Sequence, residues 1–198
     1  MKVIILGGFL GAGKTTVLLD LVPWLVQKKT GTGEYPVVVL ENEISMTDVD
    51  ARRLRDGGLT VRNLAAGCIC CTSRGELLSS VEKIQREFQP EYLIIEATGM
   101  AYPDSIKETV RGIPDVVSAK IMAVADVCRW KKLLAAMPEF VKGQLCQADV
   151  VLMNKIDLAA PAVVEEVRKS IESFTETAKL YAVSASRGIP EYCFENLL

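Results

Sequence analysis

The sequence predicts an α/β fold, a doubly wound and mostly parallel sheet flanked by helices. Three near-continuous apolar runs, at 92–96, 118–126 and 149–155, indicate strands that are apolar on both faces. Such strands belong in a parallel sheet with helices on each side. The runs alternate along the chain with longer segments of helical spacing, which is typical of βαβ units. No repeat or linker interrupts the pattern, so we expect residues 1–198 to form one domain.

The first half of the chain opens with a short strand at 3–6 that runs into a glycine-rich segment. A helix is expected over 14–28. Pro23 should bend it or end it early, because proline has no amide hydrogen for the helix interior. Apolar positions close to helical spacing predict another helix over 74–88. Two further strands are expected in this half, at 37–41 and, shorter, at 59–64.

The second half continues the alternation, with the three apolar runs as its strands. Helices are expected at about 129–146 and 161–174, and a last strand at 179–185. The stretch 28–36 is interpreted as a flexible surface turn. For the terminal residues 187–198 we expect a packed turn, with docking on a partner as the alternative.

Composition excludes several classes of partner. Of the 198 residues, 49% are hydrophobic and 24% charged, and the net charge of −2 gives no basic footprint for nucleic acid or an anionic membrane. No apolar run is long enough to span a bilayer, and the N-terminal run is too short for a signal peptide. We therefore expect a cytoplasmic protein with reduced thiols, in which the six cysteines are not a disulfide framework.

A phosphate-binding loop is predicted directly after the first strand. GFLGAGKT at 8–15 matches G-x-x-x-x-G-K-[ST] between a strand and a helix, the context that the motif needs. Its glycines let backbone N–H groups turn toward phosphate oxygens, and the helix start adds a positive field. Lys14 should reach the β- and γ-phosphates, and Thr15 should hold Mg²⁺. The predicted nucleotide-binding residues here are Gly8, Gly11, Ala12, Gly13, Lys14, Thr15 and Thr16.

The base is predicted to be guanine, because NKID at 154–157 stands at the end of a strand. The Asp157 carboxylate can accept from both N1–H and the exocyclic amine of guanine, and adenine offers no such pair of donors. The segment after the last strand is a candidate to contact the base edge through backbone N–H groups, with an ordinary strand end as the equal alternative. The residues predicted to bind GTP or GDP here are Asn154, Lys155, Asp157, Ser184 and Ala185.

Between these two motifs a strand ends at Glu96, within IIEATGMAYP. We expect Glu96 to hold Mg²⁺ directly or through water, and Gly99 to sense the γ-phosphate. The alternative is a strand that ends in a solvated acid. Together with Lys14 and Thr15, these two residues make up the predicted catalytic set.

Three cysteines crowd into GCICC at 67–71, in a chain without histidine. Soft thiolates on one loop can converge on Zn²⁺, Cu(I) or another thiophilic metal. Three of them leave a fourth tetrahedral position open for a carboxylate, water or client ligand, which suits a carrier. The alternatives are small buried residues or a redox-sensing thiol pair. The proposed ligands are Cys68, Cys70 and Cys71; the packing cysteines are Cys128, Cys146 and Cys193.

Taken together, these segments resemble the CobW/HypB/UreG family of metal-handling GTPases, and its CobW-like branch most of all. The matching segments are GGFLGAGKTT, ENE, GCICC, EATGMAYP and QADVVLMNKIDL. The resemblance implies a P-loop NTPase fold and a nucleotide-dependent homodimer, in which GTP hydrolysis controls delivery of a divalent metal to a client metalloprotein. It implies zinc or cobalt at the three cysteines, joined by Glu41 or Glu43. Nickel is less favoured, because no imidazole is present.

The chain departs from the family pattern at three places. Ile44 and Ser45 follow Glu43 where the family usually has a glycine at the second position. The sequence contains no histidine, and because it ends at Leu198 we expect the C-terminal domain that the family commonly adds to be absent. Phe9 stands where related ATPases carry a lysine, which argues against an ATPase.

The proposed mechanism couples the two sites through residues 41–50. We expect the γ-phosphate to order this segment and thereby to shape the metal site. Asp48 and Asp50 are candidates to position water, with solvated turn residues as the alternative. Two other functions are weighed: a small-molecule P-loop kinase, in which NKID has no role, and a redox-sensitive nucleotide-binding module with a thiol switch.

Overall fold

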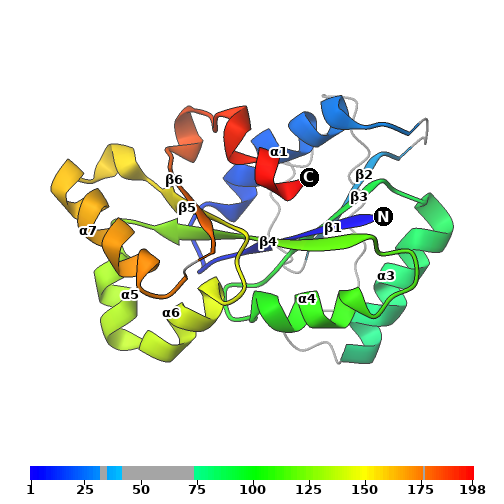
Figure 1. Cartoon of the computed structure of the whole chain (residues 1–198), viewed down its shortest axis with the longest axis horizontal. Coiled ribbons are helices and arrows are strands. Elements are labelled where there is room, and N and C mark those ends of the chain that lie inside the picture. Colours follow the sequence, from blue (N-terminus) through cyan, green and yellow to red (C-terminus); the bar gives the residue numbers. More distant parts are fainter. Residues whose placement is uncertain (32–34, 42–73, 176) are drawn as a thin grey trace.

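A computed structural model describes residues 1–31, 35–41, 74–175 and 177–198. Within these ranges the chain forms a six-stranded sheet in the order β2-β3-β1-β4-β5-β6, with every neighbouring pair parallel (Figure 1). The predicted fold class is therefore confirmed. The strands are β1 Lys2–Gly7, β2 Val37–Glu41, β3 Tyr92–Glu96, β4 Ser118–Asp126, β5 Val150–Asn154 and β6 Lys179–Ala182.

Helices cover both faces of the sheet (Figure 1). The α-helices are α1 Lys14–Lys28, α3 Arg74–Phe88, α4 Pro103–Arg111, α5 Trp130–Ala136, α6 Pro138–Leu145 and α7 Pro161–Glu172. The short 3₁₀ helices are η1 Ile156–Leu158, η2 Ala185–Arg187, η3 Glu191–Cys193 and η4 Glu195–Leu197. One face packs against α1 and the C-terminal turns, and the other packs against α3 to α7. Side chains of β1 alternate between these two cores, which explains why its run is continuously apolar.

The carboxyl ends of the strands meet at one edge of the sheet. Leu6 of β1 is in register with Glu96 of β3, and Asp126 of β4 is in register with Asn154 of β5. The loop after β1 therefore starts beside the end of β3, at the edge of the sheet where β4 and β5 also end. Ligands of open α/β sheets bind at this edge, so the fold places the predicted nucleotide residues where a site is expected.

The structure differs from the expected helices at three places. The helix expected at 129–146 is two helices, because Met137 precedes Pro138 and takes φ −144° and ψ 62°, outside the helical region. Helix α1 continues through Pro23 to Lys28, so the early end is wrong. Helix α4 was not predicted; it begins at Pro103, a favourable first residue for a helix.

The last strand is shorter than expected and ends at Ala182, and the short strand expected at 59–64 lies outside the described residues. The C-terminal turns pack as predicted, with Phe194 buried against Trp24. Cys193 is buried, and this burial raises the pKa of its thiol to about 11. The packing role predicted for Cys128 and Cys146 is wrong, because both are exposed. No helix among the described residues is both long enough and apolar enough to cross a bilayer.

Candidate functional site

The loop after β1 has the backbone of an anion cradle. Gly8, Gly11 and Gly13 have φ of +135°, +74° and +106°, which side-chain-bearing residues rarely adopt. A Cβ atom on Gly8 would lie 2.4 Å from the Val124 carbonyl oxygen, so the loop also approaches β4 too closely for a side chain. No side chain caps α1 at Gly13. The first-turn N–H groups lack intrahelical acceptors, as at every helix start, and suit phosphate oxygens.

Lys14, the first residue of α1, holds a positive charge inside this cradle. Its side chain is buried, and its ammonium group donates to the Gly8 carbonyl oxygen at 3.1 Å. Ala12 is also buried, and its N–H donates to the Phe9 carbonyl oxygen at 3.0 Å, closing the tip of the loop. Thr15 and Thr16 follow in the first turn and are half-buried. The geometry fits a triphosphate, whose β- and γ-phosphates Lys14 would neutralise.

Asn154 joins the predicted guanine motif to this loop. Its amide nitrogen donates to the Ala12 carbonyl oxygen at 2.8 Å. Its amide oxygen accepts from the N–H groups of Lys155 at 2.8 Å and Ala185 at 2.9 Å. The residue is almost fully buried, so these bonds replace water that it cannot reach. The Ala185 N–H expected at the base edge is thus bonded to Asn154, and its contact with a base stays a prediction.

Lys155 and Arg129 hold the loop from its outer side. The Lys155 ammonium donates to the Gly11 carbonyl oxygen at 2.6 Å and pairs with Asp126 at 2.7 Å. The Arg129 guanidinium donates to the Leu10 carbonyl oxygen at 2.8 Å. Lys155 has φ +68°, in the left-handed region, and such backbone conformations cluster at functional sites. Two cations thus bond carbonyl groups of the loop tip.

Asp157 is oriented by Ser184. The Ser184 hydroxyl lies 2.7 Å from Asp157 Oδ1 and donates to it. The carboxylate keeps further acceptor capacity at both oxygens, because each carries two lone pairs. The two segments that were predicted to surround a base, at 154–157 and 184–185, are therefore brought together around one carboxylate.

The end of β3 lies against the same loop. Glu96 is in register with Leu6, and the Ala97 N–H donates to the Leu6 carbonyl oxygen at 2.9 Å. A Cβ atom on Gly99 would lie 2.6 Å from the Leu10 backbone nitrogen, so only glycine fits there. The buried Thr98 hydroxyl has no hydrogen-bond partner in the described chain. Thr98 stands two residues after Glu96 and next to Gly99, so its orphaned hydroxyl belongs to the segment where a hydrated Mg²⁺ ion held by Thr15 and Glu96 would fit.

Three residues of this site were not predicted: Asp126, Arg129 and Gln144. Gln144 of α6 accepts from the Gly8 N–H at 3.1 Å and donates to the Ala101 carbonyl oxygen, joining the phosphate loop to the segment after β3. Asp126 could have been found, because it is an acid at the end of an apolar strand. Nothing local in the sequence marks Arg129 or Gln144.

The predicted metal ligands Cys68, Cys70, Cys71 and Glu43 lie outside the described residues, as do Asp48 and Asp50. In the described ranges, no group of three or more cysteine, aspartate or glutamate side chains is placed to hold a metal ion. The backbone of β2 ends at Glu41, in register with Glu96. The segment with the predicted ligands therefore begins at the edge of the sheet where the phosphate loop lies.

Comparisons with known proteins agree with this geometry. A sequence profile of the CobW/HypB/UreG nucleotide-binding domain matches residues 2–182. The zinc chaperone YjiA of Escherichia coli strain K12 is 31% identical over 199 residues, which cover 93% of this chain and 58% of YjiA. The chain spans about half the length of the curated relatives it matches.

Solved structures share the fold. A crystal structure of a Zn(II)-bound triple mutant of the YjiA GTPase aligns with a TM-score of 0.69 at 22% identity, covering 100% of this chain and 61% of YjiA. The hydrogenase maturation factor HypB from Archaeoglobus fulgidus aligns with a TM-score of 0.66 at 16% identity, covering 97% of this chain and 85% of HypB. At these identities the likeness concerns the fold alone.

Proposed function

The chain belongs to the CobW/HypB/UreG family, and from that premise we propose that it is a GTP-hydrolysing metallochaperone. In this proposal it binds a divalent metal and delivers it to a client metalloprotein. The observation that supports the nucleotide part most strongly is the Asn154 side chain, which bonds both the phosphate loop and the segment after β6. A phosphate-binding loop and a guanine-reading carboxylate then act as one site.

GTP would bind along the carboxyl edge of the sheet. Lys14 would bond the β- and γ-phosphates, and Asp157 would accept from the two guanine donors while Ser184 keeps it oriented. When Mg²⁺ is bound, it neutralises charge that develops on the phosphate oxygens. Gly99 leaves room for the loop at Leu10, so its backbone would lie within reach of the γ-phosphate.

The transferred metal would bind at Cys68, Cys70 and Cys71, with Glu43 as the fourth ligand. Soft thiolates favour Zn²⁺ over Mg²⁺, and a carboxylate is a weaker fourth ligand that a client can displace. The names of the relatives support zinc: YjiA is called a zinc chaperone, and its GTPase has a Zn(II)-bound structure. Cobalt is the second choice, and nickel is disfavoured by the absence of histidine.

Coupling between the two sites would run through the residues that follow β2. Strand β2 ends at Glu41 beside Glu96, and the chain is next described at Arg74, where α3 begins. A γ-phosphate beside Glu96 is therefore close to the start of the segment that holds all four proposed ligands. GTP binding would change metal affinity through this segment, and hydrolysis would release the metal to the client. A nucleotide-dependent homodimer, as the resemblance implies, belongs to the same proposal.

The test combines phosphate release with metal counting. Purified protein should release phosphate from Mg-GTP and not from Mg-ATP, and the Lys14→Ala variant should not release it. Reduced wild-type protein should hold one zinc by elemental analysis after gel filtration, and a variant with Cys68, Cys70 and Cys71 all changed to serine should hold none. Hydrolysis of ATP in preference to GTP, or equal zinc in both proteins, would contradict the proposal.

A further inference from the structure

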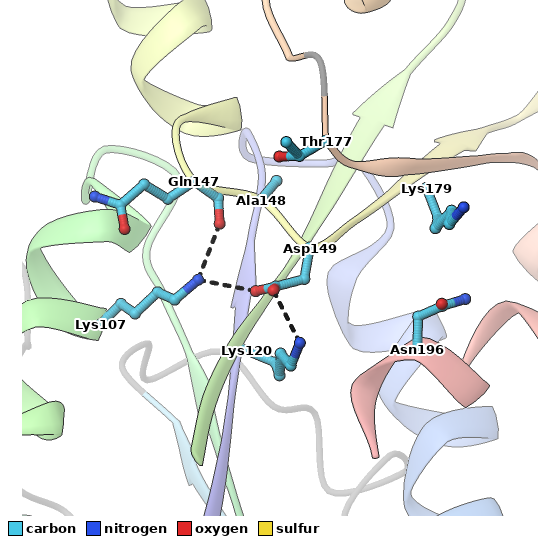
Figure 2. A pocket seen from close by; sticks show the side chains of 8 residues that line it. All are labelled: Lys107, Lys120, Gln147, Ala148, Asp149, Thr177, Lys179 and Asn196. Carbon is cyan, nitrogen blue, oxygen red and sulfur yellow. Dashed lines mark hydrogen bonds and ion pairs between the residues drawn. The ribbon is translucent and has the colours of Figure 1, made fainter.

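A polar cavity lies at the edge of the sheet opposite the phosphate loop, where β4, β5 and β6 begin. Its volume is about 370 Å³, and Figure 2 shows the side chains around it. The lining includes Lys107 of α4, Lys120 of β4, Asp149 before β5, Lys179 at the start of β6 and Asn196 of η4. Strand β5 separates it from Asn154 by five residues, roughly 17 Å at the rise of a parallel strand. No nucleotide-site residue lines it.

Asp149 lies at the centre of this cavity, and its carboxylate already accepts three hydrogen bonds. One oxygen accepts from the Lys107 ammonium at 2.9 Å and the Ile121 N–H at 2.8 Å, and the other accepts from Lys120 at 3.2 Å. Burial alone would raise the pKa of Asp149, but these hydrogen bonds and the lysine charges hold it below its usual value. The carboxylate therefore stays ionised and has little remaining capacity to neutralise a further cation.

The lining has more positive charge than Asp149 can balance. Three lysines face a single carboxylate, which leaves two net positive charges around one cavity. Lys107 is almost fully buried and is fixed by bonds to Asp149 and to the Gln147 carbonyl oxygen at 3.1 Å. The Lys179 ammonium makes no hydrogen bond or ion pair with the residues that the structure describes, although its backbone is fixed by the N–H bond to the Asp149 carbonyl oxygen at 3.0 Å. The Thr177 hydroxyl adds a further donor to the lining.

We propose that this cavity is a binding site for a small oxyanion, a phosphate or carboxylate group on a low-molecular-weight compound, separate from the nucleotide site. The volume lies within the range of small-molecule pockets. Ammonium and hydroxyl donors from separate segments line it, and oxyanions are the groups that such donors recognise. If the lysines served only to anchor the start of β5, Lys107 and Lys120 would suffice, and Lys179 would have no role.

The test uses the full chain saturated with Mg-GDP, which occupies the phosphate loop. Inorganic phosphate is titrated at constant ionic strength, with sodium chloride as the compensating salt, and backbone amide signals are followed by NMR. A parallel titration with succinate distinguishes a phosphate site from a carboxylate site. The variant is Lys179→Gln, which leaves the Asp149 contacts in place. The matched control is Lys132→Gln, an exposed lysine of α5 that loses the same charge away from the cavity.

We expect saturable shifts at the amides of Ala148, Thr177 and Lys179 with at least one of the two anions. Affinity should fall about tenfold in Lys179→Gln, the loss of one charge-assisted hydrogen bond, and should stay unchanged in Lys132→Gln. Thermal unfolding should show that both variants are folded. The proposal is overturned if neither anion gives saturable shifts at these amides, if shifts appear only at the phosphate loop, or if both variants weaken binding equally.

Discussion

The Asn154 amide nitrogen lies 2.8 Å from the carbonyl oxygen of Ala12, a contact between residues 142 positions apart in the chain. The same side chain accepts the N–H of Ala185 at 2.9 Å. Its position fixes the phosphate loop and the segment after β6 relative to each other. A ligand that spans both segments meets a site whose two halves are already aligned, which lowers the ordering cost of binding.

Changing Asn154 to alanine should destabilise the protein even without nucleotide. The change leaves the Ala12 carbonyl and the Ala185 N–H buried without their partner, and each unsatisfied group costs about 1–3 kcal/mol. We expect urea unfolding at neutral pH to show a loss of roughly 2–4 kcal/mol. Asn196→Ala is the control, because the one side-chain hydrogen bond of Asn196 within the described residues is an exposed one to the Tyr181 hydroxyl. Equal losses in both variants would contradict the assigned bridge.

Changing Asp157 to asparagine should change which base is bound. The asparagine amide keeps one acceptor oxygen but places an N–H donor against the second guanine donor, whereas the carboxylate accepts from both, so GDP should bind at least about 100-fold more weakly. Xanthine has an oxygen in place of the guanine amine, and it should then bind better than guanine. Fluorescent analogues of GDP and of xanthosine and adenosine diphosphates measure this. Unchanged GDP affinity in this variant would show that the guanine base does not bind at Asp157.

Changing Gly13 to alanine should separate steric conflict from backbone strain. The new Cβ would lie 2.4 Å from the Asn154 amide nitrogen at φ +106°. Gly188 is the matched control, because its φ is +93° and an added Cβ meets nothing within 4 Å. We expect Gly13→Ala to weaken GDP binding more than about tenfold, and Gly188→Ala to cost only about 1–2 kcal/mol of stability. If GDP affinity fell equally in both variants, backbone strain alone would explain the loss.

Asp149 should make stability depend on pH in the acid range. The pKa of Asp149 in the folded protein lies below the ordinary value of 3.8. Its contribution to the free energy of unfolding is therefore complete above pH 3.8 and is lost as the pH falls through the lower pKa of the folded protein. Asp149→Asn should be less stable than wild type by roughly 2–4 kcal/mol near pH 7, because Lys107 stays buried without its counter-charge.

The difference in unfolding free energy between the two proteins should begin to narrow below the ordinary value of 3.8, and it should close as the pH falls through the lower pKa of the folded carboxylate. Urea unfolding across a pH series measures it, with the exposed Glu172→Gln as the control for a lost surface carboxylate. A difference in unfolding free energy that stayed constant down to about pH 2 would show that the charge of Asp149 does not cause it.

Most of the fold can be predicted from the sequence, because the signals for strands and helices lie within single short segments. Strands buried on both faces produce continuous apolar runs, and such runs place β4 and β5 in one parallel sheet. The break at Pro138 was also visible, since a residue before proline avoids the helical region, and it was missed because the apolar spacing continues past it. Pro103 with Ile106 and Val110 likewise marks α4.

The contacts that assemble the site could not be predicted in the same way. The Gln144 bond to the Gly8 N–H joins residues 136 positions apart, and no neighbour of Gln144 in the sequence indicates it. Lys120 and Lys179 resemble ordinary charged residues of strands until β4, β5 and β6 align and bring them around Asp149. Motifs identify residues that share one segment, whereas these contacts arise only when separate strands come into register.

The most direct test of GTP-controlled metal binding is a zinc competition titration on reduced protein. It compares the Mg-GDP form with the form bound to Mg²⁺ and a non-hydrolysable GTP analogue, and includes the variant with Cys68, Cys70 and Cys71 changed to serine. We expect one tight site that requires the cysteines and whose zinc affinity differs at least about fivefold between the nucleotide states, the lower end of typical allosteric coupling. Equal zinc affinity in both states would contradict it.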